Sequence, residues 1–199
     1  MNKGETINSK VLGSPNKIIW EYCECLRNMV RDIQESNGLE QDQRKALPCI
    51  FMGIAIIETF LNVYFRQLIE EAEYKIYRKQ ILRELDETAP LDLKIKVWPK
   101  RFFSHEMDFS CGIGQRFMAL KKLRNNLMHF KSSYETVDLP GMQIQGVADI
   151  SSYENLDRDI AWESLRVAEE MIAEIFRLRR MSPDEIKLAM QSWTGKVPE

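Results

Sequence analysis

Glycine and proline are scarce in this chain, which has only 9 glycines and 7 prolines in 199 residues. Leucine, isoleucine, glutamate, lysine and arginine are abundant instead, and these residues favour helix over sheet. The composition, 44% hydrophobic and 29% charged, argues against global disorder. A chain of this length usually forms one domain, so we expect a single helical domain over residues 1–199.

Cysteine and histidine are sparse as well. There is no CxxC pair, and the cysteines are Cys23, Cys25, Cys49 and Cys111. Four scattered cysteines predict reduced thiols rather than a disulfide framework or a zinc site. His105 stands near Glu106 and Asp108, but the spacing matches no standard metal site, so we expect a loop histidine. Gly-rich phosphate loops, GxSxG and HExxH are absent too, and the sequence predicts neither a metal nor a cofactor.

The chain has no large excess of positive or negative charge, and it has no long hydrophobic run. A net charge of -2 argues against a strongly basic nucleic-acid coat but leaves room for a local positive patch. The first ten residues are polar, so we expect no secretory signal. The most hydrophobic run, residues 46–57, is shorter than the roughly 20 residues of a membrane span and predicts a buried helix. We therefore expect a cytoplasmic protein without a membrane partner.

Helical periodicity recurs in four separate segments. Each carries apolar residues at spacings of three and four, which places them on one face of a helix. The core helices are predicted at about residues 15–36, 44–84, 113–131 and 158–180. A capping-box pattern at Ser182, Pro183 and Glu185 predicts a short terminal helix over 182–193. The predicted fold class is all-α, a four-helix up-and-down bundle with long insertions between its helices.

The first insertion, residues 86–110, contains Pro90 and Pro99 and shows no sustained period. Such a long connection is uncommon in a compact domain, so we expect it to be functional or draped over the core. Three of its aromatic residues, Trp98, Phe102 and Phe103, stand close together in the sequence. They are expected to pin the connection to the bundle; beside the neighbouring lysines and Arg101, stacking on nucleic-acid bases is the alternative.

The second insertion, residues 132–157, carries a weak alternation of apolar residues around Gly146. The alternating residues are Met142, Ile144, Val147 and Ile150. This pattern is compatible with a small β-hairpin near 142–150.

The stretch "KKLRNNLMHFK", residues 121–131, mixes basic and apolar side chains. On a helical wheel one side must face the core, and it carries Phe117, Leu120, Leu123, Leu127 and Phe130. Lys121, Asn125 and His129 form a second ridge that is predicted to face away from the core. Arg124 lies at the edge of the apolar stripe.

A guanidinium at the edge of a core needs a carboxylate or several acceptors, because an unpaired buried charge costs several kcal/mol. Glu58 lies on the most buried predicted helix, with Asn62 one turn further along the same face. We therefore predict a contact between Glu58 and Arg124.

These residues resemble a known motif. In "LRNNLMHF", Arg124 is followed by Asn125 and, after four intervening residues, by His129. The pattern resembles the R-x(4–6)-H motif of the HEPN superfamily, whose members are small all-helical proteins. The apolar segment "GIAIIETFLNVYF", with Glu58 and Asn62, resembles the preceding helix of several HEPN groups. In helix order, the resemblance covers roughly residues 15–180.

The resemblance implies a homodimer in which two motif-bearing helices meet in a cleft, and in many members a metal-independent endoribonuclease. His129 would take a proton from a ribose 2′-hydroxyl or give one to the leaving oxygen, and the product would be a 2′,3′-cyclic phosphate. Arg124 would stabilise the charge on the phosphoryl oxygens, and Asn125 would orient the imidazole or the substrate. The RNA backbone would be held by Lys121, Lys122 and Lys131. A toxin or defence role with an antitoxin or regulatory partner would follow.

On one ideal helix, positions five apart diverge by roughly 140°, so Arg124 and His129 would converge only through helix distortion or a second copy. Two other interpretations stay open. The first is a non-catalytic HEPN-like module for dimerisation or for binding nucleic acid or protein. The second is a plain structural bundle, in which the basic ridge is a solvated face and the histidine is incidental.

Overall fold

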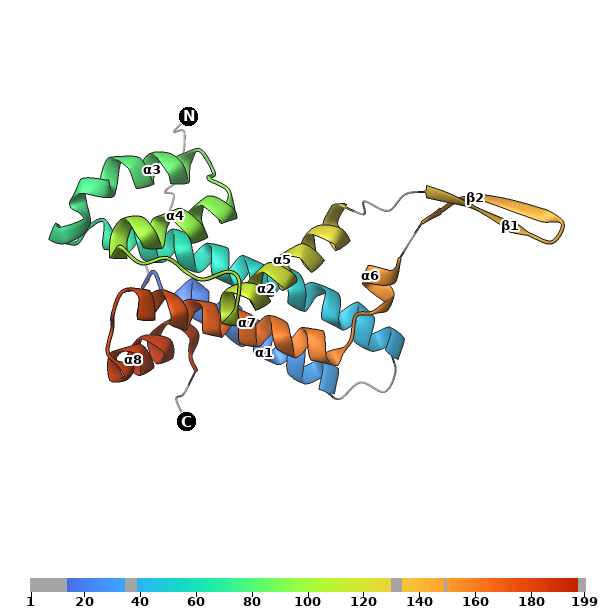
Figure 1. The fold of residues 1–199 in the computed structure, drawn as a ribbon. Coiled ribbons are helices and arrows are strands. Elements are labelled where there is room, and N and C mark those ends of the chain that lie inside the picture. Colours follow the sequence, from blue (N-terminus) through green and yellow to red (C-terminus); the bar gives the residue numbers. More distant parts are fainter. Residues whose placement is uncertain (1–13, 35–38, 130–133, 149, 197–199) are drawn as a thin grey trace, which may run out of the picture.

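Helices make up most of the protein (Figure 1). The computed structural model describes residues 14–34, 39–129, 134–148 and 150–196. The elements are α1 (Lys17–Gln34), α2 (Leu39–Leu68), the 3₁₀ helix η1 (Ala72–Tyr77), α3 (Arg78–Asp86), α4 (Leu91–Phe103), α5 (Gly112–His129), β1 (Tyr134–Leu139), β2 (Met142–Ala148), α6 (Ser151–Glu154), α7 (Arg158–Leu178) and α8 (Pro183–Thr194). The predicted all-α class is confirmed, with one small two-stranded sheet added to it.

The central helix is α2, which packs against α1, α5 and α7. At Gly53 it lies close to α7, since a Cβ atom there would be 2.9 Å from the backbone oxygen of Ser164. The segment Asp42–Leu68 is long and apolar enough to cross a membrane, and no other helix in the described part of the chain is. Half of its apolar window, 50%, is buried inside the protein, and the helix provides much of the core. The predicted buried helix is confirmed.

The second predicted helix, residues 44–84, is wrong in its extent. The α-helix ends at Leu68, and the chain continues through a turn and η1 into α3. The reason is burial: Tyr74 and Ile81 are 6% and 0% exposed, because the chain folds back onto the core. A straight helix would have carried both side chains into water, at a hydrophobic cost.

Residues 86–110 are not a long connection, because they contain the helix α4. The apolar residues that α4 buries follow a spacing of four, three and four: Leu91, Ile95, Trp98 and Phe102. Pro99 is tolerated inside the helix although its ring removes a hydrogen-bond donor. The aromatic side chains do pin this segment to the body, since Trp98 is 0% exposed and Phe102 packs on Phe65.

Helices α3 and α4 are joined by the carboxylate of Glu84, which is 8% exposed. It accepts hydrogen bonds from Trp98 Nε1 at 2.6 Å, from both terminal nitrogens of Arg101 at 3.0 and 3.2 Å, and from Gln80 at 2.9 Å. Burial raises the pKa of Glu84, but the hydrogen bonds from Arg101, Trp98 and Gln80 outweigh it and hold the pKa below its ordinary value.

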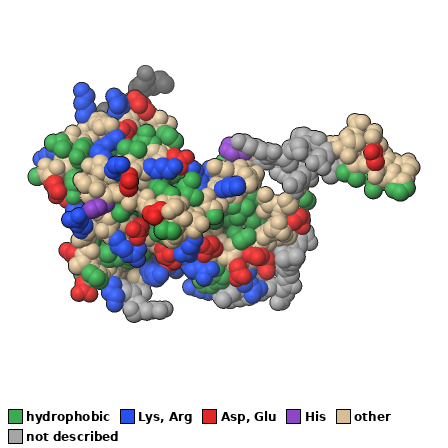
Figure 2. All heavy atoms as spheres, in the orientation of Figure 1, with side chains coloured by type: hydrophobic (Ala, Val, Ile, Leu, Met, Phe, Trp, Pro, Cys, Tyr) green, Lys and Arg blue, Asp and Glu red, His purple; other side chains and the backbone are tan. Residues whose placement is uncertain are grey.

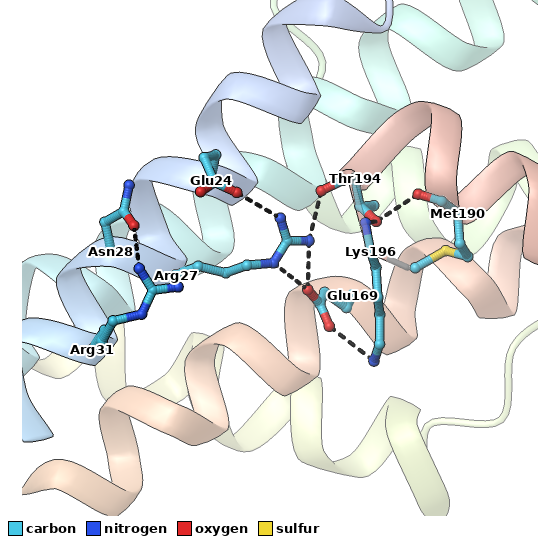
Figure 3. Close-up of polar contacts among 8 residues, drawn as sticks. All are labelled: Glu24, Arg27, Asn28, Arg31, Glu169, Met190, Thr194 and Lys196. Atoms are coloured by element: carbon cyan, nitrogen blue, oxygen red, sulfur yellow. Dashed lines mark hydrogen bonds and ion pairs between the residues drawn. The ribbon is translucent and has the colours of Figure 1, made fainter. Parts of the chain in front are cut away.

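The predicted terminal helix is confirmed as α8, and Ser182 and Glu185 form the expected capping box. This helix packs on α1 and α7. Figure 3 shows how its end is held: the buried Glu169 of α7 binds Arg27 of α1 at 2.8 Å and Lys196 at 3.0 Å. Arg27 also donates to the backbone oxygen of Thr194 at 2.6 Å. The segment is therefore an integral part of the helical body.

A hairpin is present where the alternation suggested one, but it begins earlier, at Tyr134. Strands β1 and β2 pair antiparallel around Pro140 and Gly141, with Val137 opposite Ile144. The register shifts between Glu135 and Val137, and Gly146 has a φ of 80°. A glycine in this conformation is typical of a bulge that accommodates one extra residue on one strand. In Figure 1 the hairpin projects away from the helical body.

Candidate functional site

The first half of α5 is fixed by close packing and by ion pairs. Gly114 lies against the preceding loop, where a Cβ atom would stand 2.1 Å from the backbone oxygen of Asp108. Asp108 accepts hydrogen bonds from the backbone nitrogen and hydroxyl of Ser110 and from the Cys111 thiol, and these bonds lower the pKa of its carboxyl. The geometry requires glycine at position 114 and sets the direction in which α5 leaves the loop.

Arg116 ties the same half of α5 to α7. Its Nε and Nη2 atoms donate to Glu163 at 2.6 and 3.0 Å, and Nη1 donates to Glu170 at 2.5 Å. These hydrogen bonds raise the pKa of the Arg116 guanidinium above its ordinary value despite partial burial. All three nitrogens of the guanidinium are used within the chain, so Arg116 is a structural residue.

The predicted apolar stripe of α5 does face the core. Phe117 and Leu120 are buried, and Leu123 and Leu127 are partly buried against the core. Phe130, the last member, lies outside the described residues. The wheel therefore orients the helix correctly, with burial decreasing toward its C-terminal end.

Of the three predicted RNA-binding lysines, Lys121 forms an ion pair inside the chain. Its Nζ atom contacts both carboxylate oxygens of Asp92 on α4, and its side chain is only 14% exposed. Lys122 is exposed, and the described chain gives it no polar partner. Lys131 lies outside the described residues.

The predicted contact between Glu58 and Arg124 is wrong. Glu58 instead accepts a hydrogen bond at 2.8 Å from Nζ of Lys94, whose side chain is 5% exposed. A buried ammonium needs a carboxylate more than a half-buried guanidinium does, because less water reaches it. Lys94 belongs to α4. Because this helix was not predicted from the sequence, Lys94 was not recognised as the partner of Glu58. The spacing of Leu91, Ile95 and Trp98 was the signal that could have revealed it.

Asn62, the other supporting residue, also lies away from the motif. It lines a cavity of about 440 Å³ together with Pro15, Val63, Arg66, Gln67, Glu70 and Leu85. None of these residues belongs to α5. The Oδ1 atom of Asn62 is buried and has no hydrogen-bond partner in the described part of the chain.

Arg124 has no carboxylate partner among the described residues. Its Nη1 atom contacts Sδ of Met128 at 3.2 Å, and its Nε atom is buried without a hydrogen-bond partner. A thioether is a weak acceptor, so the guanidinium keeps most of its hydrogen-bonding capacity. Together with the exposed Lys122, Arg124 is a cation in this half of α5 that has no carboxylate partner in the described chain.

His129 and Asn125 complete the predicted catalytic set. His129 is exposed at the last position of α5, and Asn125, one turn earlier, is partly exposed. Within the described residues, neither side chain has a hydrogen-bond partner, and no bond joins His129 to Arg124. In one copy nothing in the described chain orients the imidazole.

The charge around the site is mixed rather than uniformly basic. Figure 2 shows lysine and arginine side chains interspersed with acidic ones over the visible face of the helical body. The helix α5 itself has no aspartate or glutamate; its charged residues are Arg116, Lys121, Lys122 and Arg124. Because Glu163, Glu170 and Asp92 pair Arg116 and Lys121, the positive charge of α5 without a carboxylate partner in the described chain is that of Lys122 and Arg124.

The second histidine, His105, lies in the loop before α5, as expected. Its Nε2 atom accepts a hydrogen bond from Nε of Arg180 at 2.7 Å. Within the described residues, no group of three or more histidine, cysteine or acidic side chains is placed to hold a metal ion. The four cysteines are free, and burial raises the pKa of Cys23 to about 12.

Comparison of the chain with protein-family models, with curated proteins and with solved structures finds no match.

Proposed function

We propose that the protein is a metal-independent endoribonuclease of HEPN type that acts as a homodimer. The observation that carries the proposal is the guanidinium of Arg124, which is half-buried, has an unpartnered Nε and lacks a carboxylate in the described chain. Four other arginines each form an ion pair with a glutamate of the chain: Arg27, Arg101, Arg116 and Arg179. Arg124 is among the arginines that have no carboxylate partner in the described chain, and we assign it to an external anion because a phosphate matches its planar fork.

His129 supplies the acid–base chemistry. The exposed imidazole takes the proton from a ribose 2′-hydroxyl, and the resulting oxyanion attacks the adjacent phosphorus. The protonated imidazole gives its proton to the 5′-oxygen as the P–O5′ bond breaks, and the phosphate closes into a 2′,3′-cyclic phosphate. Arg124 stabilises the charge on the phosphoryl oxygens during the attack, while Asn125 orients the imidazole or the ribose.

Two copies are needed because the groups diverge on one helix. Positions 124 and 129 point about 140° apart on ideal α-helical geometry, and no bond joins the two side chains. When two motif-bearing helices meet across a two-fold axis, Arg124 of one copy and His129 of the other face one cleft. Isologous contacts of this kind are the commonest in oligomers.

The RNA backbone is held by lysines beside the motif. Lys122 is exposed and without a partner in the described chain, so it binds phosphate directly. Lys121 contributes when phosphate competes with Asp92, whose side chain is 49% exposed. Lys131 extends the same basic edge in the sequence. A cytoplasmic toxin or defence role, with an antitoxin or regulatory protein as partner, fits this activity.

A second candidate function is a non-catalytic HEPN-like module for dimerisation or for binding nucleic acid or protein. The observation that favours it is His129, which is exposed and has no orienting hydrogen-bond acceptor within the described residues. Catalytic histidines are normally oriented by a second group.

Cleavage of single-stranded RNA in the presence of EDTA tests the proposal. We expect His129→Ala and Arg124→Ala to lower the cleavage rate by at least ~100-fold, which is the usual contribution of a general acid–base or an oxyanion-stabilising group. His105→Ala is the matched control, because it removes the other histidine and leaves α5 unchanged. An unmodified protein that binds RNA without cutting it supports the second candidate, and equal rates for the His129 and His105 variants reject the ribonuclease.

A further inference from the structure

A cavity of about 190 Å³ lies between α7 and α8, and none of its lining residues belongs to α5. Its apolar side chains are Ala173 from α7 and Ile186 and Met190 from α8. Ala173 and Met190 are each 8% exposed, and Ile186 is partly buried against the core. Ala173 stands between Glu170 and Arg177 on one face of α7, and its small side chain leaves the space that a larger residue would fill.

The two acids that line the cavity already have cationic partners in the chain. Glu169, whose side chain is 8% exposed, accepts hydrogen bonds from Arg27 at 2.8 and 3.1 Å and forms an ion pair with Lys196 at 3.0 Å (Figure 3). Glu170 accepts a hydrogen bond at 2.5 Å from Arg116. A cationic ligand would have to displace one of these partners and leave its charge unpaired, which is costly at partly buried positions. The acids therefore do not favour a cation as the ligand.

Three cations line the same cavity, and each keeps donors that the described chain does not use. Lys187 of α8 is exposed and has no polar partner in the described chain. Lys196 is 52% exposed, and its ammonium binds Glu169. Arg177 is 54% exposed and binds Glu174 through Nη1. An ammonium has three N–H donors and a guanidinium has five, so all three side chains can add hydrogen bonds to a ligand. The lining therefore favours an anion.

We propose that the cavity binds a small carboxylate with an apolar body, held at the junction of α7 and α8. The carboxylate would accept hydrogen bonds from Lys187, Lys196 and Arg177, while the hydrocarbon would lie on the apolar side chains. Ligand pockets commonly have this composition, with a mostly apolar lining and a few polar groups that fix the orientation of the ligand. A free phosphate or a sugar does not match the site, because neither covers apolar side chains.

The volume of the cavity sets the size of the ligand. An apolar cavity of about 150 Å³ accommodates a benzene ring, and this cavity is slightly larger. A straight-chain or aromatic acid of about six to eight carbons therefore fills it. Such a ligand contacts α7 and α8 at once, so its binding stabilises the folded state by mass action.

The carboxylate site is separate from the proposed ribonuclease site. Its lining includes none of Arg124, Asn125 and His129, and it is complete within one copy of the chain. Carboxylate binding can therefore be measured whether or not the protein cleaves RNA or forms a dimer. Loss of either proposal leaves the other standing.

Titration of the full-length protein with hexanoate, followed through the methionine methyl signals in its NMR spectrum, tests the site. We expect the signal of Met190, assigned with Met190→Leu, to move and to saturate. Hexanoate should bind at least ~10-fold more tightly than acetate, because burying each methylene group strengthens binding about fourfold. Hexylammonium, with the same body and the opposite charge, should bind at least ~10-fold more weakly than hexanoate. A Met190 signal that hexanoate leaves unmoved, or equal affinities for hexanoate and hexylammonium, overturns the proposal.

Variants of the lining locate the binding. Lys187→Met removes an exposed charge without touching the core, and it should weaken hexanoate binding about threefold. The matched control is Lys79→Met, which removes an exposed lysine of α3 and should leave the affinity unchanged. Ala173→Leu fills the space and should abolish hexanoate binding; because overpacking also lowers stability, its thermal unfolding is measured alongside. Equal affinities for the Lys187 and Lys79 variants, or tight binding to a folded Ala173→Leu variant, reject this cavity as the site.

Discussion

In the first half of α5, Arg116 donates to two glutamates of α7, whereas in the second half Arg124 contacts only the sulfur of Met128. Both arginines lie on one helix and at partly buried positions. The difference is in the partners: α7 presents Glu163 and Glu170 to Arg116, whereas Glu58, the predicted partner of Arg124, is bound by Lys94. An arginine of the motif helix is therefore available to a ligand only where the chain offers it no internal acceptor, whatever its position on the helix.

The largest expected effect is at the start of α5. Replacing glycine by alanine inside a helix normally gains about 1 kcal/mol, but Gly114→Ala should lower the free energy of unfolding by about 2 kcal/mol. The reason is the new Cβ atom, which would lie 2.1 Å from a backbone oxygen and force the loop to move. Chemical denaturation measures this, with the exposed neighbour Gln115→Ala as control. A gain in stability would show that the loop yields freely and does not fix α5.

Substituting the two arginines separately tests the comparison directly. Arg116→Met should cost about 1–2 kcal/mol of unfolding free energy, because it leaves two glutamates side by side without their cation. Arg124→Met should change it by less than about 0.5 kcal/mol, because no internal acceptor loses a partner other than a thioether. Equal losses would mean that Arg124 is a structural residue, and the proposed site would lose its anion-binding group.

A smaller effect is expected from acid at the loop that precedes α5. Hydrogen bonds from Ser110 and Cys111 lower the pKa of Asp108 in the folded state, so this carboxylate stabilises the fold above its unfolded pKa. That contribution is lost as the pH falls through the lowered pKa. Asp108→Asn should therefore flatten the fall in unfolding free energy between pH 5 and pH 2. A curve parallel to that of the unmodified protein would show that the loop is not held by this charge.

The local features of the fold could be predicted from sequence. Apolar spacing located α1, α5 and α7 within a few residues, and the pattern at Ser182 predicted α8 together with its capping box. The end of α2 and the presence of α4 were missed. A charged helix continuing past Leu68 and a break at Pro99 are both reasonable expectations from propensity, and tertiary burial of Tyr74 and Trp98 overrode them.

The candidate site could be predicted only in part. Phe117 and Leu120 of α5 point inward and His129 is exposed, as the helical wheel assigned them. Lys121, which the wheel turned away from the core, is only 14% exposed because it packs against Asp92 of α4. The partners of Glu58 and Lys121 were missed because they come from α4, a helix that the wheel of α5 says nothing about. Lys94, rather than the predicted Arg124, is the partner of Glu58. Asp92 is bound to Lys121, which was predicted to bind RNA.

The sequence by itself determined the helical class, the apolar faces and the order of basic and polar residues along α5, because these depend on spacing within one segment. The tertiary structure alone decided which charges neutralise one another, since an ion pair forms between atoms brought within a few ångströms by distant segments. It thereby left Arg124 without an acid in the described chain and the apolar side of the hairpin exposed. Both are properties of the assembled surface.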